Sequence, residues 1–531
     1  MRFFNNAGPV NCDDHYCLPP LSRLDLDDVL ALIQQKRYFV LHAPLQVGKT
    51  TYLLALMDYL NQSGLYRCLY FNVEVAQAAR ENVSQGIRAI LDEMAECAIY
   101  SLKDSFLREQ NWALFGANNA LNIALTRWAE ASPQPLVLLI DEIDSLMGDT
   151  LISVLRQLRA GCHKRPALFP QSIILCGRRD VRHYHLHSAQ NKTIITGGSA
   201  FNIKAKSLRL DYFTPNEIET LYQQHTDETG QSFESGTLEL VWELTAGQPW
   251  LVNALGYEVC FEMKTGRDRN IPITAEMMIE AKERLIERRE THLDQLVDKL
   301  SEKCVQRIIS PMLQGEELGQ SVRPDDIQYV IDLGLVNRGE MGLQIANPIY
   351  QEIIPRALSF ITQLNFESTI QPARYIGPDG RLDMEKLLTA FQELFREHSE
   401  HWIKKFDYQK AGIQLLLQAF LQRIINNGGR MEREYGLGRK RTDLLIIWPN
   451  NKQTQKIVLE LKWRYFLLEK TLDEGLEQTW AYMDRVGTTE GHLIIFDRHQ
   501  NTQHKDKIFR REERYRKQKI IVWGFSVNSD Q

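Results

Sequence analysis

One short stretch constrains the fold of this chain more than any other feature. It reads Ala43-Pro-Leu-Gln-Val-Gly-Lys-Thr50. A run of β-branched and aromatic residues (37–42) leads into it, and residues 51–60 have helical spacing after it. A strand, a glycine-containing loop and a helix in this order form a P-loop, whose backbone N–H groups and helix N-terminus surround phosphate groups. The stretch therefore predicts an α/β fold that binds a nucleotide.

The side chains of this loop have separate expected roles. Lys49 is expected to reach the β- and γ-phosphate oxygens, and Thr50 to ligate Mg²⁺, with Thr51 beside it among the nucleotide-binding residues. Ala43 replaces the first glycine of the usual pattern. This replacement restricts the loop but leaves Gly48 and the Lys-Thr pair in place.

A fully apolar run, residues 135–140, ends in Asp141 and Glu142. Such runs are typical of strands buried on both faces in a parallel sheet. Asp141 is expected to complete the Mg²⁺ shell, and Glu142 to orient the water that attacks the γ-phosphate. Together with the P-loop, this acidic pair predicts an ATPase.

Residues 172–177 predict the next strand, which is followed by Arg178, Arg179 and Asp180. Open α/β sheets bind ligands at the carboxyl ends of their strands. Arg178 or Arg179 could therefore sense the γ-phosphate. The alternative is a surface arginine paired with Asp180, and the sequence supports both interpretations equally.

These elements, followed by Gly247-Gln-Pro249 at a predicted helix start, resemble the AAA+/STAND class of signal-transduction ATPases over roughly residues 1–360. In that class a Gly-x-Pro element in a helical lid packs near the adenine, which implies that Gly247 and Pro249 line bound ATP. Without the resemblance, Gly-x-Pro simply encodes a turn and a helix start. We expect the ATPase core in residues 1–215 and the helical lid in residues 216–300.

The middle of the chain, residues 301–365, predicts a winged helix. Residues 305–313 and 325–336 have helical patterns, and residues 343–348 read as a short hairpin. A basic recognition helix is lacking, which favours a structural or relay role over insertion into a DNA groove. The periodicity then breaks in a stretch that contains Pro and Gly, which predicts a linker over residues 366–384.

Residues 385–531 predict a second α/β domain with αβββαβ order, beginning at an apolar helix (411–425). Glu460 and Lys462 lie two apart on one strand and so share a face, and Asp443 lies on the neighbouring strand. Asp443 and Glu460 are then expected to share one Mg²⁺, and Lys462 to position or deprotonate the attacking water. This order and these residues resemble the PD-(D/E)XK nuclease superfamily, which implies a restriction-endonuclease-like fold.

Further residues extend this predicted site. Gln478 and Tyr482 are four apart on one helical face, and they resemble the Gln-x-x-x-Tyr element of RecB-like members, which supports the active site and contacts nucleic acid. Many members also use an acid on the first helix, but residues 411–425 contain none. Glu434, or else Glu432, would have to replace it as a metal ligand. The alternative is a solvated strand residue paired with a neighbouring arginine.

Charge limits how the chain can contact nucleic acid. A net charge of −5 argues against broad coating, so contact would have to be local. One basic cluster precedes Asp443, within residues 430–441, and another occupies residues 505–519. Acids interleave with the second cluster, which equally fits a solvated helix face.

Membrane and secretory signals are lacking. No apolar run approaches the roughly 20 residues needed to cross a bilayer, and the first residues do not have the layout of a signal peptide. We therefore expect a cytoplasmic protein without a membrane partner. The eight cysteines are scattered rather than spaced as a disulfide framework. Cys12, His15 and Cys17 resemble half a zinc site, but with no second pair to complete it we expect ordinary loop residues.

The sequence thus predicts an ATP- and Mg²⁺-dependent module that controls a nuclease acting on DNA rather than RNA. The whole arrangement resembles bacterial and archaeal fusions of an ATPase and a nuclease, some linked to defence against foreign DNA. An alternative is a nucleotide switch whose nuclease-fold domain only binds nucleic acid or a protein partner. A third hypothesis is an ATP-driven motor, which would require a homo-oligomeric ring because the chain has one P-loop. A switch of this kind also implies an activating ligand or protein.

Overall fold

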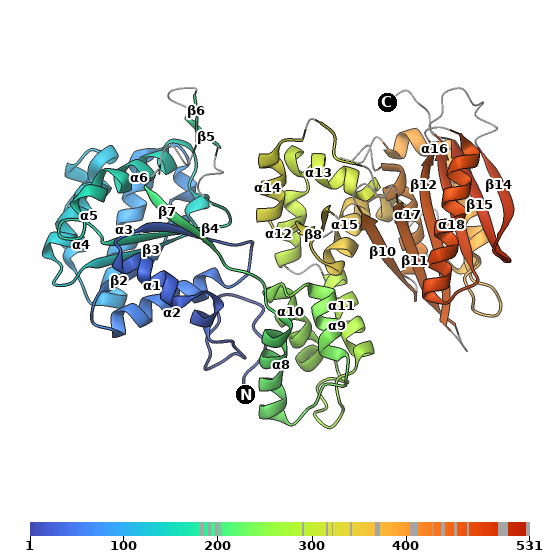
Figure 1. The fold of residues 1–531 in the computed structure, drawn as a ribbon, viewed down its shortest axis with the longest axis horizontal. Helices are drawn as coiled ribbons and strands as arrows, with labels where there is room; N and C mark the ends of the chain where they lie inside the picture. The colour runs from blue at the N-terminus through green and yellow to red at the C-terminus, as the bar shows by residue number, and fades with distance from the viewer. Residues whose placement is uncertain are drawn as a thin grey trace. The chain divides into compact units, whose positions relative to one another are not determined.

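The structure is a computed structural model. It describes the whole chain except residues 181–184, 189–192, 197–200, 202, 289–290, 315–316, 321, 340–341, 367–371, 404–411, 427, 437–440, 451–453, 465–466, 498–507 and 527–531. The chain forms two compact units (Figure 1): Met1–Leu285 with Asp332–Gly334, and Ile286–Ile331 with Leu335–Gln531. The sequence-based boundaries at residues 215, 300, 365 and 384 stay a prediction.

The first unit is built on a parallel sheet whose described strands run in the order β2-β3-β4-β1-β7. These strands are β1 (Tyr38–His42), β2 (Arg67–Asn72), β3 (Leu136–Asp141), β4 (Ser172–Gly177) and β7 (Lys204–Arg209). Every residue of β3 and β4 is buried, as expected for strands covered on both faces. This mixed α/β layout is consistent with a P-loop ATPase core.

Helices cover both faces of this sheet. α1 (Leu26–Gln34) and α2 (Lys49–Gln62) pack on one face. α3 (Val83–Leu102), α5 (Ala117–Ala131) and α6 (Gly148–Gly161) pack on the other. The shorter elements are η1 (Pro20–Arg23), η2 (Val73–Ala79), α4 (Phe106–Glu109), η3 (Trp112–Leu114), η4 (Ile143–Ser145), η5 (Cys162–Lys164), β5 (His185–Ser188) and β6 (Thr193–Thr196).

A helical segment completes the first unit. Its elements are α8 (Pro215–Thr229), α9 (Thr237–Thr245), α10 (Pro249–Tyr257), η7 (Glu258–Glu262) and α11 (Ala275–Arg288). We call them the lid. α8 begins with a capping box, in which Thr214 and Glu217 each accept a hydrogen bond from the other's backbone N–H. Pro249 occupies the first turn of α10, where its missing N–H costs nothing.

The second unit begins with the segment predicted as a winged helix. Its elements are α12 (Thr291–Lys299), α13 (Lys303–Gln314), α14 (Pro324–Asp332), β8 (Val336–Gly339), β9 (Gly342–Ile345) and α15 (Pro348–Phe366). β8 and β9 form an antiparallel hairpin. η8 (Pro372–Tyr375) then leads to α16 (Met384–Ile403) and α17 (Gly412–Ile425).

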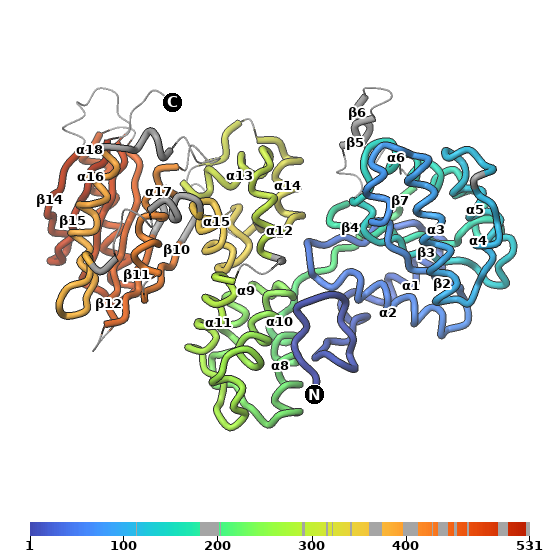
Figure 2. The backbone as a smooth tube through the Cα atoms, turned by 180° about the vertical axis from the view of Figure 1, so that it is seen from behind, coloured from blue at the N-terminus to red at the C-terminus, as the bar shows by residue number. Residues whose placement is uncertain are grey.

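A second sheet follows, with its described strands in the order β10-β11-β12-β13-β15-β14. They are β10 (Arg430–Gly436), β11 (Arg441–Pro449), β12 (Thr454–Arg464), β13 (Gly491–Asp497), β14 (Phe509–Tyr515) and β15 (Gln518–Ser526). α18 (Leu468–Val486) packs on one face. On the other face Phe391 of α16 lies 5.3 Å from Phe420 of α17 and 5.4 Å from Phe525 of β15, ring centre to ring centre; Figure 2 shows these helices from behind.

Two features of this unit differ from the sequence-based expectations. The helix-face interpretation of residues 505–519 is wrong for its described part, because Phe509–Tyr515 form strand β14, antiparallel to β15. β14 is an edge strand with mostly exposed, charged side chains, so hydrophobic alternation does not reveal it. In addition, α16 precedes the helix that was expected to come first. Among the described helices, none combines the length and apolarity that crossing a membrane requires.

Candidate functional site

The loop between β1 and α2 turns sharply because two of its residues adopt the left-handed conformation. Gly48 has a φ of 98° and Gln46 a φ of 55°, and glycine adopts this conformation without steric cost. Lys49 begins α2 and is 5% exposed. Its Nζ donates to the carbonyl oxygens of Ala43 (3.2 Å) and Pro44 (3.0 Å). The loop therefore closes around a buried ammonium group.

The predicted magnesium ligands of the first unit contact each other directly. Thr50 Oγ1 donates to Asp141 Oδ2 (2.7 Å), and Tyr70 Oη donates to the same oxygen (3.0 Å). Asp141 is fully buried at the end of β3. Burial, with Asp141 nearby, raises the pKa of Tyr70, so its hydroxyl stays a donor. A hydroxyl and a carboxylate at this edge are hard oxygen ligands and fit a Mg²⁺ ion beside a nucleotide.

Glu142 follows directly and adopts a left-handed conformation, with a φ of 52°. Its backbone N–H donates to Asp141 Oδ1 (2.9 Å). Burial raises the pKa of the Glu142 carboxyl, and the positive charges of Lys49 and Arg178 partly oppose that rise. A carboxylate with a raised pKa is better suited to accept a proton from water than an ordinary one.

Arg178 pairs with a different acid from the one that the sequence suggested. Its backbone N–H donates to Asp144 Oδ1 (3.2 Å), and its Nε lies 3.6 Å from Asp144 Oδ2. Asp180 instead accepts from Lys204 Nζ, at 2.8 and 2.6 Å. Asp144 thus holds Arg178 close enough to Glu142 to affect its pKa.

A cavity of about 320 Å³ lies beside these groups. The residues predicted to bind nucleotide that line it are Gly48, Lys49, Thr50, Thr51, Glu142 and Pro249. Gly247 packs against Phe213: its carbonyl accepts from the Phe213 N–H (2.8 Å), and a Cβ at this position would lie 2.0 Å from the Phe213 carbonyl oxygen. Glycine therefore permits the close approach of two backbone segments here.

Sequence reasoning missed one wall of the cavity. Residues 5–10 and 16–18 line it, together with Trp250 and Asn253 of α10. We call residues 1–18 the N-terminal strap. Its contacts depend on tertiary structure, and these residues carry no nucleotide-binding motif that could have indicated them.

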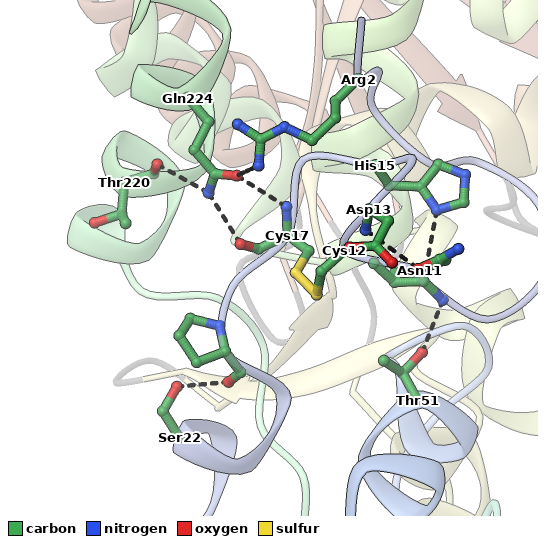
Figure 3. Close-up of a disulfide and its surroundings, with 12 residues drawn as sticks. Arg2, Asn11, Cys12, Asp13, His15, Cys17, Ser22, Thr51, Thr220 and Gln224 are labelled. Atoms are coloured by element: carbon green, nitrogen blue, oxygen red, sulfur yellow. Dashed lines mark hydrogen bonds between the residues drawn. A yellow bond between two sulfur atoms is a disulfide. The ribbon is translucent and has the colours of Figure 1, made fainter. Parts of the chain in front are cut away.

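The strap contains a disulfide between Cys12 and Cys17 (Figure 3). The expectation that both are ordinary loop cysteines is therefore wrong. The zinc interpretation gains no support, because no group of three or more potential metal ligands occurs among the described side chains. Spacing alone did not reveal the bond, since a single pair of cysteines five residues apart forms no framework.

In the second unit, strand pairing aligns the predicted acids. Glu434 of β10 pairs with Asp443 of β11, and Asp443 pairs with Glu460 of β12. Residues directly opposite each other on antiparallel strands belong to the same face of a sheet. The side chains of Glu434 and Asp443 lie outside the described residues. The backbone register is therefore what brings the three positions into one row.

The third acid of this row and the neighbouring Lys462 are buried. Glu460 is fully buried and Lys462 is 5% exposed, and Lys462 Nζ lies 3.1 Å from Glu460 Oε1. Leu493 of β13 is the next residue in the row. The acid oxygens of such a row would suit Mg²⁺, so the residue types fit the metal that the sequence predicted.

α18 crosses the sheet near this row. A Cβ on Gly475 would lie 2.7 Å from Leu493, the register partner of Glu460. Gln478 lies less than one turn further along α18, and its Oε1 is buried without a hydrogen-bond partner among the described residues. Tyr482 belongs to the hydrophobic core beneath the helix.

The arginines near Glu434 contact other carboxylates. Arg430 Nε lies 3.3 Å from Glu432 Oε1. Arg433 has a side chain that is 1% exposed and forms an ion pair with Glu352 of α15. It also donates to Gln418 (3.2 Å) and Gln422 (2.7 Å) of α17. Arg439 and Lys440, which the sequence placed in the same basic cluster, lie outside the described residues.

Comparison with solved structures finds distant similarity over about two thirds of the chain. A Walker-type ATPase of Pyrococcus abyssi is 13% identical, covering 66% of this chain and 99% of its own, with a TM-score of 0.46. The RuvB Holliday junction branch migration motor of Thermotoga maritima is 13% identical, covering 61% of this chain and 90% of its own, with a TM-score of 0.32. Cdc6p from Pyrobaculum aerophilum is 14% identical, covering 65% of this chain and 93% of its own, with a TM-score of 0.35.

No protein-family model and no curated protein matches the sequence. At such TM-scores the structural similarity carries no argument about activity. Function is therefore assigned from the residues of the two candidate sites.

Proposed function

We propose that the first unit binds ATP with Mg²⁺ and hydrolyses it, and that its nucleotide state controls a Mg²⁺-dependent nuclease in the second unit. The proposed ATP hydrolysis is supported above all by the Thr50–Asp141 contact at 2.7 Å, beside the closed loop around Lys49. These are the three groups that a bound nucleoside triphosphate and its metal require.

Each residue then has a task in hydrolysis. Lys49 leaves the loop carbonyls and pairs with the β- and γ-phosphates. Thr50 and Asp141 hold the ion, which neutralises charge on the γ-phosphate when it is bound. Glu142 orients the attacking water and accepts its proton, and its raised pKa favours that step. Arg178, held by Asp144, is assigned to stabilise the charge that develops on the γ-phosphate.

The nuclease half depends on the row formed by Glu434, Asp443 and Glu460, with Lys462 beside it. In this proposal the carboxylates hold the metal, and Lys462 orients the water that attacks phosphorus. Burial of Glu460 and Lys462 supports the proposal. Withdrawing an ion pair from solvent costs free energy, and such costly pairs are concentrated at functional sites. Gln478 is assigned to support this site.

Exposed cations on the β14–β15 hairpin support local contact with nucleic acid. Arg511, Arg514, Arg516 and Lys517 are exposed. The guanidinium of Arg516 also stacks on Trp480 of α18, at 4.3 Å. Paired cations and aromatic rings suit a phosphate backbone with stacked bases. We assign DNA as the target because Gln478 and Tyr482 of α18 resemble the Gln-x-x-x-Tyr element of RecB-like nucleases.

A cleavage assay tests the proposal. Linear, circular and single-stranded DNA, and RNA, are incubated with Mg²⁺ and either ATP or ADP. We expect cleavage that depends on the nucleotide, is lost in Lys462→Ala and loses its nucleotide dependence in Lys49→Ala. Lys470→Ala is the matched control, since Lys470 is an exposed lysine on α18. Intact substrates under all conditions, with unchanged binding by Lys462→Ala, would show that nuclease action is wrong.

The composition of α17 favours the alternative of a switch that binds nucleic acid or protein without cutting. Its buried face carries Gln414, Gln418 and Gln422 and no acid, although many PD-(D/E)XK members place one on their first helix. Calorimetry separates the two functions. Tight Mg²⁺ or Mn²⁺ binding that is lost in Asp443→Ala supports the nuclease, whereas absence of binding near Glu460 supports the switch.

A further inference from the structure

The N-terminal strap is fixed to the lid by side-chain and backbone contacts. Arg2 Nε lies 3.2 Å from Glu228 Oε2. The N–H of Cys17 donates to Gln224 Oε1 (3.1 Å), and Gln224 Nε2 donates back to the Cys17 carbonyl (2.9 Å). Tyr16 Oη lies 3.1 Å from His225 Nδ1. All three lid residues belong to α8, so the strap follows this helix; Figure 3 shows the contact between Gln224 and Cys17.

The same strap is also fixed to the helix of the P-loop. The N–H of Val10 donates to Thr51 Oγ1 (3.1 Å) in the first turn of α2. Trp250 Nε1 of α10 donates to the Asn6 carbonyl (2.8 Å). Because residues 5–10 and 16–18 line the cavity, the strap spans it from the P-loop side to the lid side. Opening the cavity along this wall requires these contacts to separate.

The disulfide joins the two stretches of the strap that line the cavity. Cys17 lines the cavity, and Cys12 follows the first lining stretch by two residues. Cys12 is an exposed residue and Cys17 is half-buried, so a reagent in solution would approach the bond from the Cys12 side. The bond closes a short loop and removes conformational freedom from it. The strap is therefore stiffer when the bond is present.

We propose that Cys12 and Cys17 form a site of thiol–disulfide exchange that sets how fast nucleotide leaves the cavity. In the oxidised state the stiff strap retains the nucleotide, and in the reduced state the strap opens more often. This inference rests on the proposed nucleotide binding, but not on the nuclease.

The chemical step requires a dithiol as reductant. A thiolate of the dithiol attacks Sγ of Cys12, the more exposed of the two cysteines, and Cys17 leaves as a thiolate that takes up a proton. The second thiol of the reductant then attacks the mixed disulfide and releases Cys12. Two electrons pass to the protein, the reductant ends as its own disulfide, and an oxidised dithiol reverses the sequence.

The other cysteines offer an internal comparison. Cys68, Cys176 and Cys260 are buried thiols, and Cys97, Cys162 and Cys304 are partly exposed thiols. Burial raises the pKa of the Cys97 thiol to about 12, which lowers its thiolate fraction and its reactivity. Cys97→Ser is therefore a matched control for replacement of a partly exposed cysteine away from the cavity.

Release of a fluorescent ATP analogue from the full chain tests the proposal. The dissociation rate constant is measured in oxidised protein, after treatment with dithiothreitol, and after reoxidation, with alkylation and mass measurement to count thiols. We expect release to become about tenfold faster on reduction, within the range that closing a short loop allows, and to slow again on reoxidation. Cys97→Ser should behave as the original chain.

The double variant Cys12→Ser with Cys17→Ser provides the decisive comparison. It should release the analogue at the reduced rate whether or not dithiothreitol is present, and its melting temperature shows whether it is folded. Equal release rates in the oxidised and reduced original chain would overturn the proposal, as would oxidised protein in which Cys12 and Cys17 both still alkylate. Failure of the chain to bind the analogue in any state would instead overturn the proposed ATP binding.

Discussion

The two candidate sites are assembled in different ways. The nucleotide site gathers groups from separate parts of the first unit: the loop after β1, the end of β3 and the strap. The acid row of the second unit comes from β10, β11 and β12, neighbours in one sheet. A site of the first kind depends on several elements packing together, and a site of the second kind depends on strand register. A one-residue slip would move an acid to the other face.

The largest expected effect separates the chemistry of the two sites. Lys462→Ala should lower DNA cleavage by about 10³-fold, within the range for losing a group that activates water. ATP hydrolysis should be unchanged, because Lys462 belongs to the second unit. Paired rate measurements on the same preparation check this. Equal loss of both activities would mean that the two sites are not separate.

The second prediction concerns the buried ion pair that holds β10, the first strand of the acid row. Arg433→Ala should lower the free energy of unfolding by about 3 kcal/mol, at the lower end of the range for breaking a buried ion pair, because it removes the buried partner of Glu352 and leaves only Arg356, whose guanidinium lies 3.4 Å away. Denaturant unfolding of the full chain measures this. Arg430→Ala on the same strand is the control, since Arg430 and Glu432 are both about a third or more exposed and such pairs contribute less than about 1 kcal/mol. Similar losses of unfolding free energy in both variants would contradict the expected difference between the buried and the exposed ion pair.

A third prediction separates ATP binding from ATP hydrolysis at the proposed nucleotide site. Glu142→Gln should slow ATP hydrolysis by about 10²-fold while ATP still binds, because the phosphate contacts of Lys49 and Thr50 remain. Stopped-flow binding and phosphate release measure the two quantities separately. Glu130→Gln, an exposed residue of α5, should change neither. Loss of binding in Glu142→Gln would place this residue in ligand recognition instead.

The smallest expected effect is a pH dependence. Glu142 must be ionised to accept a proton, and burial raises its pKa above the ordinary value. Hydrolysis should therefore fall as the pH drops through this raised pKa, starting at a higher pH than for an ordinary glutamate. The change should be at most about tenfold per pH unit. The residual activity of Glu142→Gln should lack this step, and a step that persists would assign the titration to another group.

The features that could be predicted from the sequence are those formed by residues close together along the chain or on adjacent strands. The strand, loop and helix around Lys49 are contiguous, so their pattern reveals the P-loop without tertiary information. Pairing of Asp443 with Glu460 could be predicted because alternation along β12 fixes which residues share a face. Both predictions need only neighbouring residues or neighbouring strands.

What the sequence did not reveal depends on long-range contacts or on an exposed position. Tyr70 reaches Asp141 only because β2 lies beside β3. The strap carries no motif, and its place against α2 and α8 is set by packing. β14 lacks an apolar face long enough to register as alternation, because edge strands carry charged side chains that discourage pairing with other chains.

The Arg433–Glu352 pair has a consequence for how this chain can be recombined. It joins α15, from the segment predicted as a winged helix, to β10 of the sheet. A gene fragment that began after α15 would encode a sheet whose interior guanidinium lacks its carboxylate partner, and the fragment before it would keep Glu352 with Arg356 alone. Shuffling between genes is therefore expected to transfer α15 and the sheet together, with the viable break point upstream of both.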